Sequence, residues 1–137
     1  MRRTCIVLAG AIALAAGPAM AVDQALIEQS YSEAFRQCLD RPEGQSTHGM
    51  IACVSAELEL QDAALNVAYR EALTRLVPRQ QAKLRAAQRA WVAFRDADCA
   101  AHYDEEGGSM STISANFCVL RRTVERTIEL EDFGSGD

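Results

Sequence analysis

The sequence predicts an all-α domain, built as antiparallel helical hairpins or a bundle of about four helices and stapled by disulfides. Between Met50 and Glu106 the chain has no glycine and a single proline, and it is rich in Ala, Leu, Glu, Gln and Arg, which are good helix formers. Apolar residues recur there at steps of three, four and seven, as on the buried face of an amphipathic helix. No useful stretch alternates at period two, so no strand is expected.

The beginning of the chain is typical of a cleavable export signal. Arg2 and Arg3 form a basic start, an apolar stretch follows over residues 4–17, and Ala19-Met20-Ala21 has the small residues of a cleavage site. The stretch falls short of the ~20 residues that span a bilayer, which argues against a membrane anchor. Cys5 precedes the cleavage site and leaves with the peptide, so no lipid anchor is expected after cleavage near Ala21.

Three segments follow from this boundary. We expect a signal peptide over residues 1–21, a helical domain over residues 22–131, and a short Gly-rich flexible tail over residues 132–137. The 116 residues that remain after cleavage are enough for one domain with one modest core.

Four helices are expected within that domain. They run from about Asp23 to Leu39, Met50 to Val77, Arg79 to Tyr103 and Ser114 to Glu131. The positions aligned on one face of each helix are, in order, Ile27, Tyr31, Phe35 and Cys38; Leu58, Leu65, Tyr69, Ala72 and Leu76; Leu84, Ala87, Trp91, Phe94 and Asp98; and Phe117, Leu120, Val124 and Ile128.

The breaks between these helices carry turn and capping residues. Residues 41–49 and residues 104–112 are predicted loops, and the second ends in Ser and Thr, which favour helix N-caps. Val77 precedes Pro78 and is therefore pushed out of the helical region, which predicts a turn and a hairpin of the second and third helices. A kinked continuous helix is the alternative.

The chain left after cleavage has four cysteines, Cys38, Cys53, Cys99 and Cys118. An even count in an exported chain of this size predicts disulfides. Local pairing, Cys38 with Cys53 and Cys99 with Cys118, would staple each hairpin across its loop, although sequence alone leaves three connectivities open. No C-x-x-C is present and His48 and His102 lie outside ligand spacing, so neither a metal nor a cofactor is expected.

The charge of the domain is acidic. Removing residues 1–21 leaves 12 Lys and Arg against 19 Asp and Glu, a formal charge of −7. Such a surface repels nucleic acid and anionic lipid and attracts basic protein partners, chiefly by faster association.

No catalytic constellation is evident, and we expect that the protein is not an enzyme. Asp96 and Asp98 are two residues apart on a helix and do not face each other. The G-x-S-x-G, H-E-x-x-H and phosphate-cradling glycine motifs are absent from the sequence. An enzyme acting on envelope material remains an alternative without residues to support it.

Polar residues recur on the apolar sides of the second, third and fourth helices. We interpret them as a structural hydrogen-bond network that holds the helices in register, since buried polar groups need partners. A ligand pocket is the alternative interpretation. The residues are Asp62, Asn66, Tyr69, Gln88, Trp91, Arg95 and Arg126.

The second loop is the candidate partner-binding segment. It combines three consecutive acids, a tyrosine and two glycines between Cys99 and Cys118, which predicts a pre-organised acidic surface for a basic partner. An ordinary solvated turn is the alternative. The candidate residues are Tyr103, Asp104, Glu105, Glu106, Gly107, Gly108 and Ser109.

These residues together resemble a known family. The pattern includes Cys53, then Asp62-x-x-Leu65-Asn66-x-x-Tyr69, then Leu84-x-x-x-Gln88-x-x-Trp91-x-x-x-Arg95-Asp96-x-x-Cys99, a Gly107-Gly108-Ser109 turn, and Cys118-x-x-x-x-Thr123-x-x-Arg126-x-x-x-Leu130. It covers about residues 38 to 130 and is similar to the lysozyme inhibitor LprI-like family of exported bacterial proteins.

The resemblance implies a small helical, disulfide-linked domain that binds and inhibits lysozyme. The family label derives from a lipid-anchored member, whereas this sequence has no lipid-attachment cysteine at its cleavage site, which implies a soluble periplasmic protein. The acidic loop would occlude the active-site cleft of a basic lysozyme, with Ser109 donating to a catalytic carboxylate. The alternative is a structural or interaction module of the envelope without a role toward lysozyme.

Overall fold

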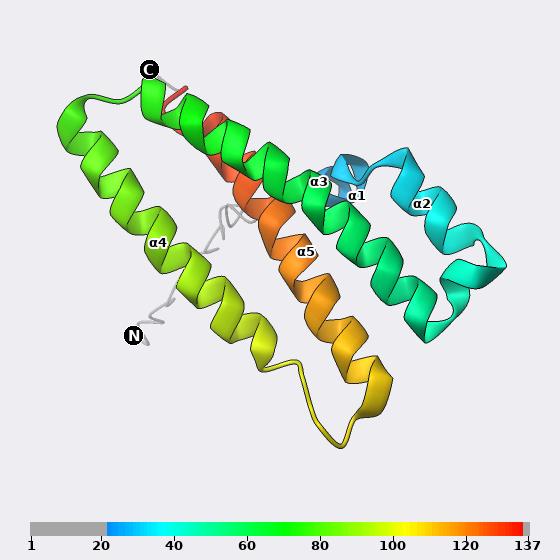
Figure 1. Ribbon diagram of the computed structural model, residues 1–137. Coiled ribbons are helices and arrows are strands. Elements are labelled where there is room, and N and C mark those ends of the chain that lie inside the picture. The colour runs from blue at the N-terminus through cyan, green and yellow to red at the C-terminus, as the bar shows by residue number, and fades with distance from the viewer. Residues whose placement is uncertain (1–21, 136–137) are drawn as a thin grey trace, which may run out of the picture.

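The computed structural model describes residues 22–135, and this part of the chain is helical without a strand (Figure 1). The expected signal peptide, residues 1–21, lies outside the described residues. The elements in chain order are α1 (Gln24–Ser30), α2 (Glu33–Asp40), the 3-10 turn η1 (Pro42–Gln45), α3 (Thr47–Thr74), α4 (Pro78–Ala100) and α5 (Gly108–Asp132).

The core of the molecule lies between α3 and α5, which run side by side in the same direction, while α4 runs back between them in sequence (Figure 1). One apolar cluster gathers Leu65, Ala68, Ala72, Leu84 and Leu130 toward the α3–α4 turn. A second gathers Phe35, Cys53, Val54 and Leu120 where α2 covers the beginning of α3. The apolar stripes that the sequence predicts on these helices therefore bury against one another, which is what stabilises an amphipathic helix.

Arg75 ties the ends of α3 and α5 together. Its Nη2 donates hydrogen bonds to the carbonyl oxygens of Leu130 and Glu131 at 2.8 and 3.1 Å, and its Nε donates to that of Phe133 at 3.0 Å. The last carbonyls of a helix have no partner inside the helix and carry a partial negative charge, so a guanidinium there both satisfies and neutralises them. Helix α5 includes Asp132, the first residue of the expected tail.

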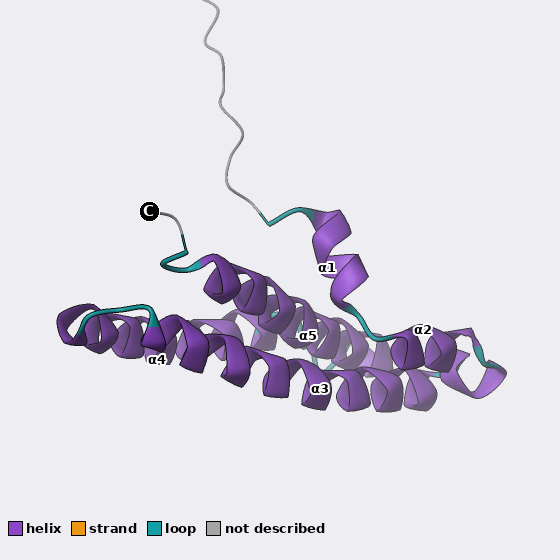
Figure 2. Cartoon of the chain, turned by 90° about the horizontal axis from the view of Figure 1, so that it is seen from above, coloured by secondary structure: helices purple, strands orange, loops and turns teal. Residues whose placement is uncertain are grey.

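The prediction of one continuous helix from Asp23 to Leu39 is wrong. The backbone is extended at Tyr31 and Ser32, where α1 ends and α2 begins. The Ser32 side chain caps α2 by accepting from the Phe35 amide, while its own amide and hydroxyl donate to the buried carboxylate of Glu57 on α3. A capping serine held by a buried acid outweighs the helix propensity of the flanking residues, so the chain bends and α1 stands out from the rest (Figure 2).

The remaining helix ends shift by up to two turns from the prediction. Ser46 caps α3, which begins at Thr47 inside the expected first loop. Pro78 occupies the first turn of α4, where a missing amide is harmless, and the chain reverses there, which confirms the hairpin and rules out the kinked helix (Figure 1). The fourth helix begins at Gly108, six residues before the expected start.

Helix α4 is the least buried of the long helices. Of its 23 residues only Leu84 and Cys99 are buried, and it contacts α5 far more than α3. Phe94, which the apolar pattern placed in the core, is 54% exposed, and Ala87 is exposed as well. These two assignments are wrong because α4 borders only one neighbouring helix closely, so the face it buries is narrower than its apolar stripe.

The disulfides join Cys38 with Cys53 and Cys99 with Cys118, which confirms local pairing. The first ties α2 to the beginning of α3, and the second ties the end of α4 to α5. Both lie toward the same end of the molecule, the end at which α3 and α5 begin (Figure 1). None of the described helices combines the length and the apolarity needed to cross a membrane.

Candidate functional site

The segment between α4 and α5 forms a short ordered turn at the disulfide end of the molecule. The Asp104 carboxylate accepts a hydrogen bond from the Glu106 amide at 3.0 Å, and the Gly107 amide donates to the Asp104 carbonyl at 3.0 Å. The Ser111 hydroxyl lies 2.7 Å from the same carbonyl and 2.8 Å from that of Gly108. These local bonds fix the backbone of the turn without help from a partner.

Two glycines allow the chain to enter α5 in this way. Gly108 has φ +61°, a left-handed conformation that disfavours any side chain. At Gly107 an added Cβ would lie 3.1 Å from the Ser111 Cβ and 3.2 Å from that of Asp104, tighter than ordinary contact. The predicted loop is therefore shorter than residues 104–112, and Gly108 and Ser109 belong to the first turn of α5.

The surface of this turn is acidic and open. Every residue from Ala101 to Met110 is exposed, including Tyr103 at 52%. Among the described residues no cation forms an ion pair with Asp104, Glu105 or Glu106. Three carboxylates without counterions, carried on a backbone that is already ordered, form a surface complementary to a cationic partner.

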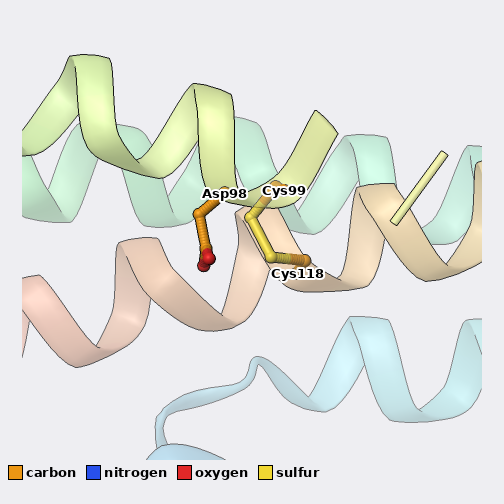
Figure 3. A group of neighbouring side chains, drawn as sticks. All are labelled: Asp98, Cys99 and Cys118. Carbon is orange, nitrogen blue, oxygen red and sulfur yellow. A yellow bond between two sulfur atoms is a disulfide. The ribbon is translucent and has the colours of Figure 1, made fainter. Parts of the chain in front are cut away.

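The base of the turn is held by the second disulfide, next to which the Asp98 side chain lies (Figure 3), and by an ion pair of that carboxylate. Asp98 precedes Cys99 on α4 and accepts from Arg122 on α5, with 3.1 Å between Oδ2 and Nη2. Arg122 also contacts Glu125 at 3.1 Å, and hydrogen bonding to Glu125 and then to Asp98 raises the pKa of its guanidinium. The Arg122 guanidinium in this ion pair therefore stays charged at any physiological pH.

At the base of the turn, one carboxylate oxygen of Asp98 and the sulfur atoms of Cys99 and Cys118 lie within 4.8 Å of one another. Such a group is suggestive of a metal site, but Cys99 and Cys118 are bonded to each other and offer no thiolate (Figure 3). Beside it lies an open hollow of about 360 Å³. Its lining includes His102, Ser114, Phe117, Arg121 and Arg122.

The predicted polar network lies between α4 and its two neighbours, and Arg95 is at its centre. The Arg95 side chain is 14% exposed and contacts Asp62 on α3 at 3.6 Å, Asp96 at 2.9 Å and the Thr123 hydroxyl on α5 at 3.2 Å. Its guanidinium also lies 5.2 Å from the ring centroid of Trp91. One arginine thus bridges three helices.

A second arginine completes the arrangement around Trp91. Arg126 lies 5.9 Å from the centroid of that ring, donates to Gln88 at 3.0 Å and pairs with Glu129 at 2.8 Å. Cation–π contacts of this kind contribute on the order of 1 kcal/mol when partly desolvated. Trp91 itself is half-buried, so it is a shared platform for two cations at the surface of the core.

Two members of the predicted network do not reach α4. Asn66 is exposed, and its amide donates to the carbonyl of Asp62 one turn earlier on the same helix. Tyr69 is half-buried and packs against the apolar cluster around Leu65. The network therefore consists of Asp62, Gln88, Arg95 and Arg126 around Trp91, with Thr123 added.

Sequence reasoning missed Arg122 and Glu57, and it named Thr123 in the family pattern without giving it a role. Asp98 directly precedes one cysteine and Arg122 follows the other by one helical turn, so the pairing of Cys99 with Cys118 is itself the signal that brings these charges together. Glu57 lies at helical spacing with Val54 and Gln61, on the apolar side of α3, where an acid needs buried donors.

Comparison with known proteins gives one family and one relative. Residues 38–130 match the protein family described as lysozyme inhibitor LprI. The sequence is 29% identical over 94 residues to the uncharacterized protein R02472 of Rhizobium meliloti strain 1021, which covers 58% of this chain and 68% of that protein. No solved structure matches the chain.

Proposed function

Because the chain belongs to the lysozyme inhibitor LprI family, we propose that it binds a lysozyme and inhibits it by occluding the active-site cleft. The family is one of inhibitors, and together with two disulfides it indicates an exported protein. We place the protein in the periplasm after cleavage of residues 1–21, and we assign it no catalytic role of its own.

The observation that carries this proposal is the ordered acidic turn from Tyr103 to Ser109. Its carboxylates are exposed and have no counterion within residues 22–135, whereas most other acids at the α4–α5 junction are paired with arginines. Lysozymes of the basic type carry cations around a sugar-binding cleft. An acidic turn would be steered toward that cleft and would enter it without first losing conformational freedom.

Each part of the turn has a role in this proposal. Asp104, Glu105 and Glu106 would pair with cations at the rim of the cleft. Gly108 has open space where a side chain would stand, which would allow close approach of the backbone. Ser109 lies in the first turn of α5 and would donate its hydroxyl to a carboxylate of the enzyme, since lysozymes cleave glycosides with a pair of carboxyl groups.

The test removes the charge of the turn while it keeps the fold of the turn. The triple variant Asp104→Asn, Glu105→Gln, Glu106→Gln retains an acceptor oxygen at position 104 for the Glu106 amide. We expect association with a basic lysozyme to slow by about tenfold or more at low salt, and the difference from wild type to shrink at high salt. Lysis of a wall suspension and association kinetics are the measurements.

A matched control separates the turn from the total charge. Glu43→Gln, Glu59→Gln, Glu71→Gln removes the same charge from exposed positions outside the turn. If both triple variants inhibit equally, the acidic turn is not the contact. If wild type slows no lysozyme of any class, the inhibitor role does not extend to this chain, and an envelope module without a role toward lysozyme becomes the better description.

A further inference from the structure

We propose that the outward face of α4 is the contact surface between two copies of this chain, packed antiparallel about a two-fold axis near Trp91. The proposal goes beyond lysozyme binding and does not depend on it. It rests on the distribution of charge along α4, on the lack of partners for those charges, and on the exposure of the face that carries them.

Charge is separated into two blocks around the middle of α4. Residues 72–95 hold six cations and no acid, although the chain as a whole is acidic. Residues 96–120 hold five acids and neither Lys nor Arg. The cations are Arg75, Arg79, Lys83, Arg85, Arg89 and Arg95, and the acids are Asp96, Asp98, Asp104, Glu105 and Glu106.

The four cations of α4 that precede Arg95 have no counterion within residues 22–135. Arg79, Lys83, Arg85 and Arg89 are exposed, and none of them takes part in an ion pair. They also stand as two pairs at a spacing of four residues, Arg79 with Lys83 and Arg85 with Arg89. Like charges at that spacing destabilise a helix, so α4 gains stability from any acidic surface laid against it.

The face of α4 between the two pairs of cations is exposed and is not covered by another described helix. Figure 1 shows α4 at an edge of the molecule, with α5 on one side and no described helix on the other. Small side chains there let a second helix approach to about 8 Å between axes. The face consists of Ala82, Ala86, Ala90, Ala93, Ala97 and Ala100, all of them exposed.

The charge pattern favours a second copy of the chain as the partner, and it favours an antiparallel arrangement of the two α4 helices. A parallel copy would set Arg85 and Arg89 against the same two arginines. An antiparallel copy, with its axis between Trp91 and Val92, sets those two arginines on either side of Asp96 of the second copy. The same register sets Arg79 and Lys83 at the C-terminal end of α4 of the second copy, next to its acidic turn, so both acidic blocks meet basic blocks. Flanking pairs of this kind fix the orientation of paired helices.

The acidic turn contacts a different surface in the proposed dimer than in the proposed complex with lysozyme. Asp104 faces α4 of the second copy in the dimer and faces the enzyme in the inhibited complex. The dimer and the complex with lysozyme are therefore competing states. Because the dimer is measured with the purified chain alone, its failure and the failure of the proposed inhibition are separate results.

The test is the mass in solution of the chain over residues 22–137, from micromolar to millimolar concentration. We expect a monomer–dimer equilibrium that molar salt weakens. Arg85→Glu with Arg89→Glu should raise the dissociation constant about tenfold or more, and addition of Asp96→Arg should restore much of the affinity by exchanging the charges. Arg41→Glu with Arg70→Glu makes the same change of charge just after α2 and on α3, and it should leave the dimer intact.

A cross-link locates the contact independently. Lys83 is the only lysine of the chain, so a zero-length reagent that joins amines to carboxylates has one side-chain amine to use. Lys83 lies about 26 Å along α4 from its C-terminal end in the same copy, by 1.5 Å per residue. A Lys83–Asp104 linked peptide therefore reports a second copy. A monomer at every concentration, or a dimer that Arg85→Glu with Arg89→Glu leaves unchanged, would overturn the proposal.

Discussion

The α3–α5 pair and helix α4 have similar lengths and similar amphipathic patterns, yet they are held in place by different forces. Seven residues of α3 and seven of α5 are buried, against two of α4. The pair is stabilised by apolar burial. Helix α4 is instead attached by a disulfide, by the Asp98–Arg122 ion pair and by the contacts of Arg95 and Arg126 around Trp91. An apolar stripe thus predicts a helix, while the number of its neighbours decides how much of that stripe is buried.

The largest difference between the two regions is expected at Leu130, which is fully buried at the end of α5. Leu130→Ala should lower the free energy of unfolding by about 3–4 kcal/mol, because it leaves a cavity in the core. Phe94→Ala on the exposed side of α4 should cost less than about 1 kcal/mol. Chemical denaturation measures both, and equal losses would mean that α4 is buried as deeply as α5.

The second disulfide is the next largest contribution. Cys99→Ala with Cys118→Ala opens a connection of 19 residues and should lower the free energy of unfolding by about 3 kcal/mol. Because α4 has few apolar contacts, its amides should also lose protection from hydrogen exchange while those of α3 retain theirs. Uniform loss of protection in all helices would show that α4 unfolds only together with the core.

A substitution of Glu57 on α3 tests whether the region stabilised by apolar burial also depends on polar contacts. Its side chain is buried and accepts from the Ser32 amide at 2.9 Å, from the Ser32 hydroxyl and from Gln61 at 2.7 Å. Glu57→Gln introduces a donor where the neighbours already donate, so we expect a loss of about 2 kcal/mol. Thermal unfolding with Glu59→Gln, an exposed position on the same helix, serves as the control.

Arg95 should show the smallest of the four effects. Arg95→Lys keeps the charge but loses the planar group that stacks on Trp91 and reaches Thr123, and we expect a loss of about 1 kcal/mol. Tryptophan fluorescence should shift as the ring becomes more hydrated. An unchanged spectrum together with unchanged stability would show that Arg95 does not fix α4.

The sequence predicted those parts of the fold that local chemistry controls. Apolar spacing gave the long helices, Pro78 gave the hairpin, and the flanking of each loop by cysteines gave the disulfide pairs. The break at Ser32 was missed because the group that holds it, Glu57, is 25 residues away in sequence. Phe94 was misplaced because a single helix pattern says nothing about how many neighbours will cover it.

The candidate site was anticipated in composition more than in shape. The three acids of the turn and their exposure follow from a polar, Gly-containing segment between two helices. Its exact length did not follow, because the bonds from Ser111 to the carbonyls of Asp104 and Gly108 extend α5 backward by about two turns. The polar network was predicted from helical spacing, but spacing alone did not separate Asn66, which stays on its own helix, from Arg95.

The pairing of α3 with α5 has a consequence for how the chain folds. The Arg75 contacts join residues up to 58 positions apart, and the whole of α4 lies between them. Closure of so long a segment is slow, and contacts of high sequence separation form late. During synthesis and export α5 emerges after the other described helices, so α3 exposes its apolar face until then. A chain cut before Gly108 lacks Leu120 and Leu130, which complete the two apolar clusters, and it should be removed by proteases and not accumulate as a partly folded product.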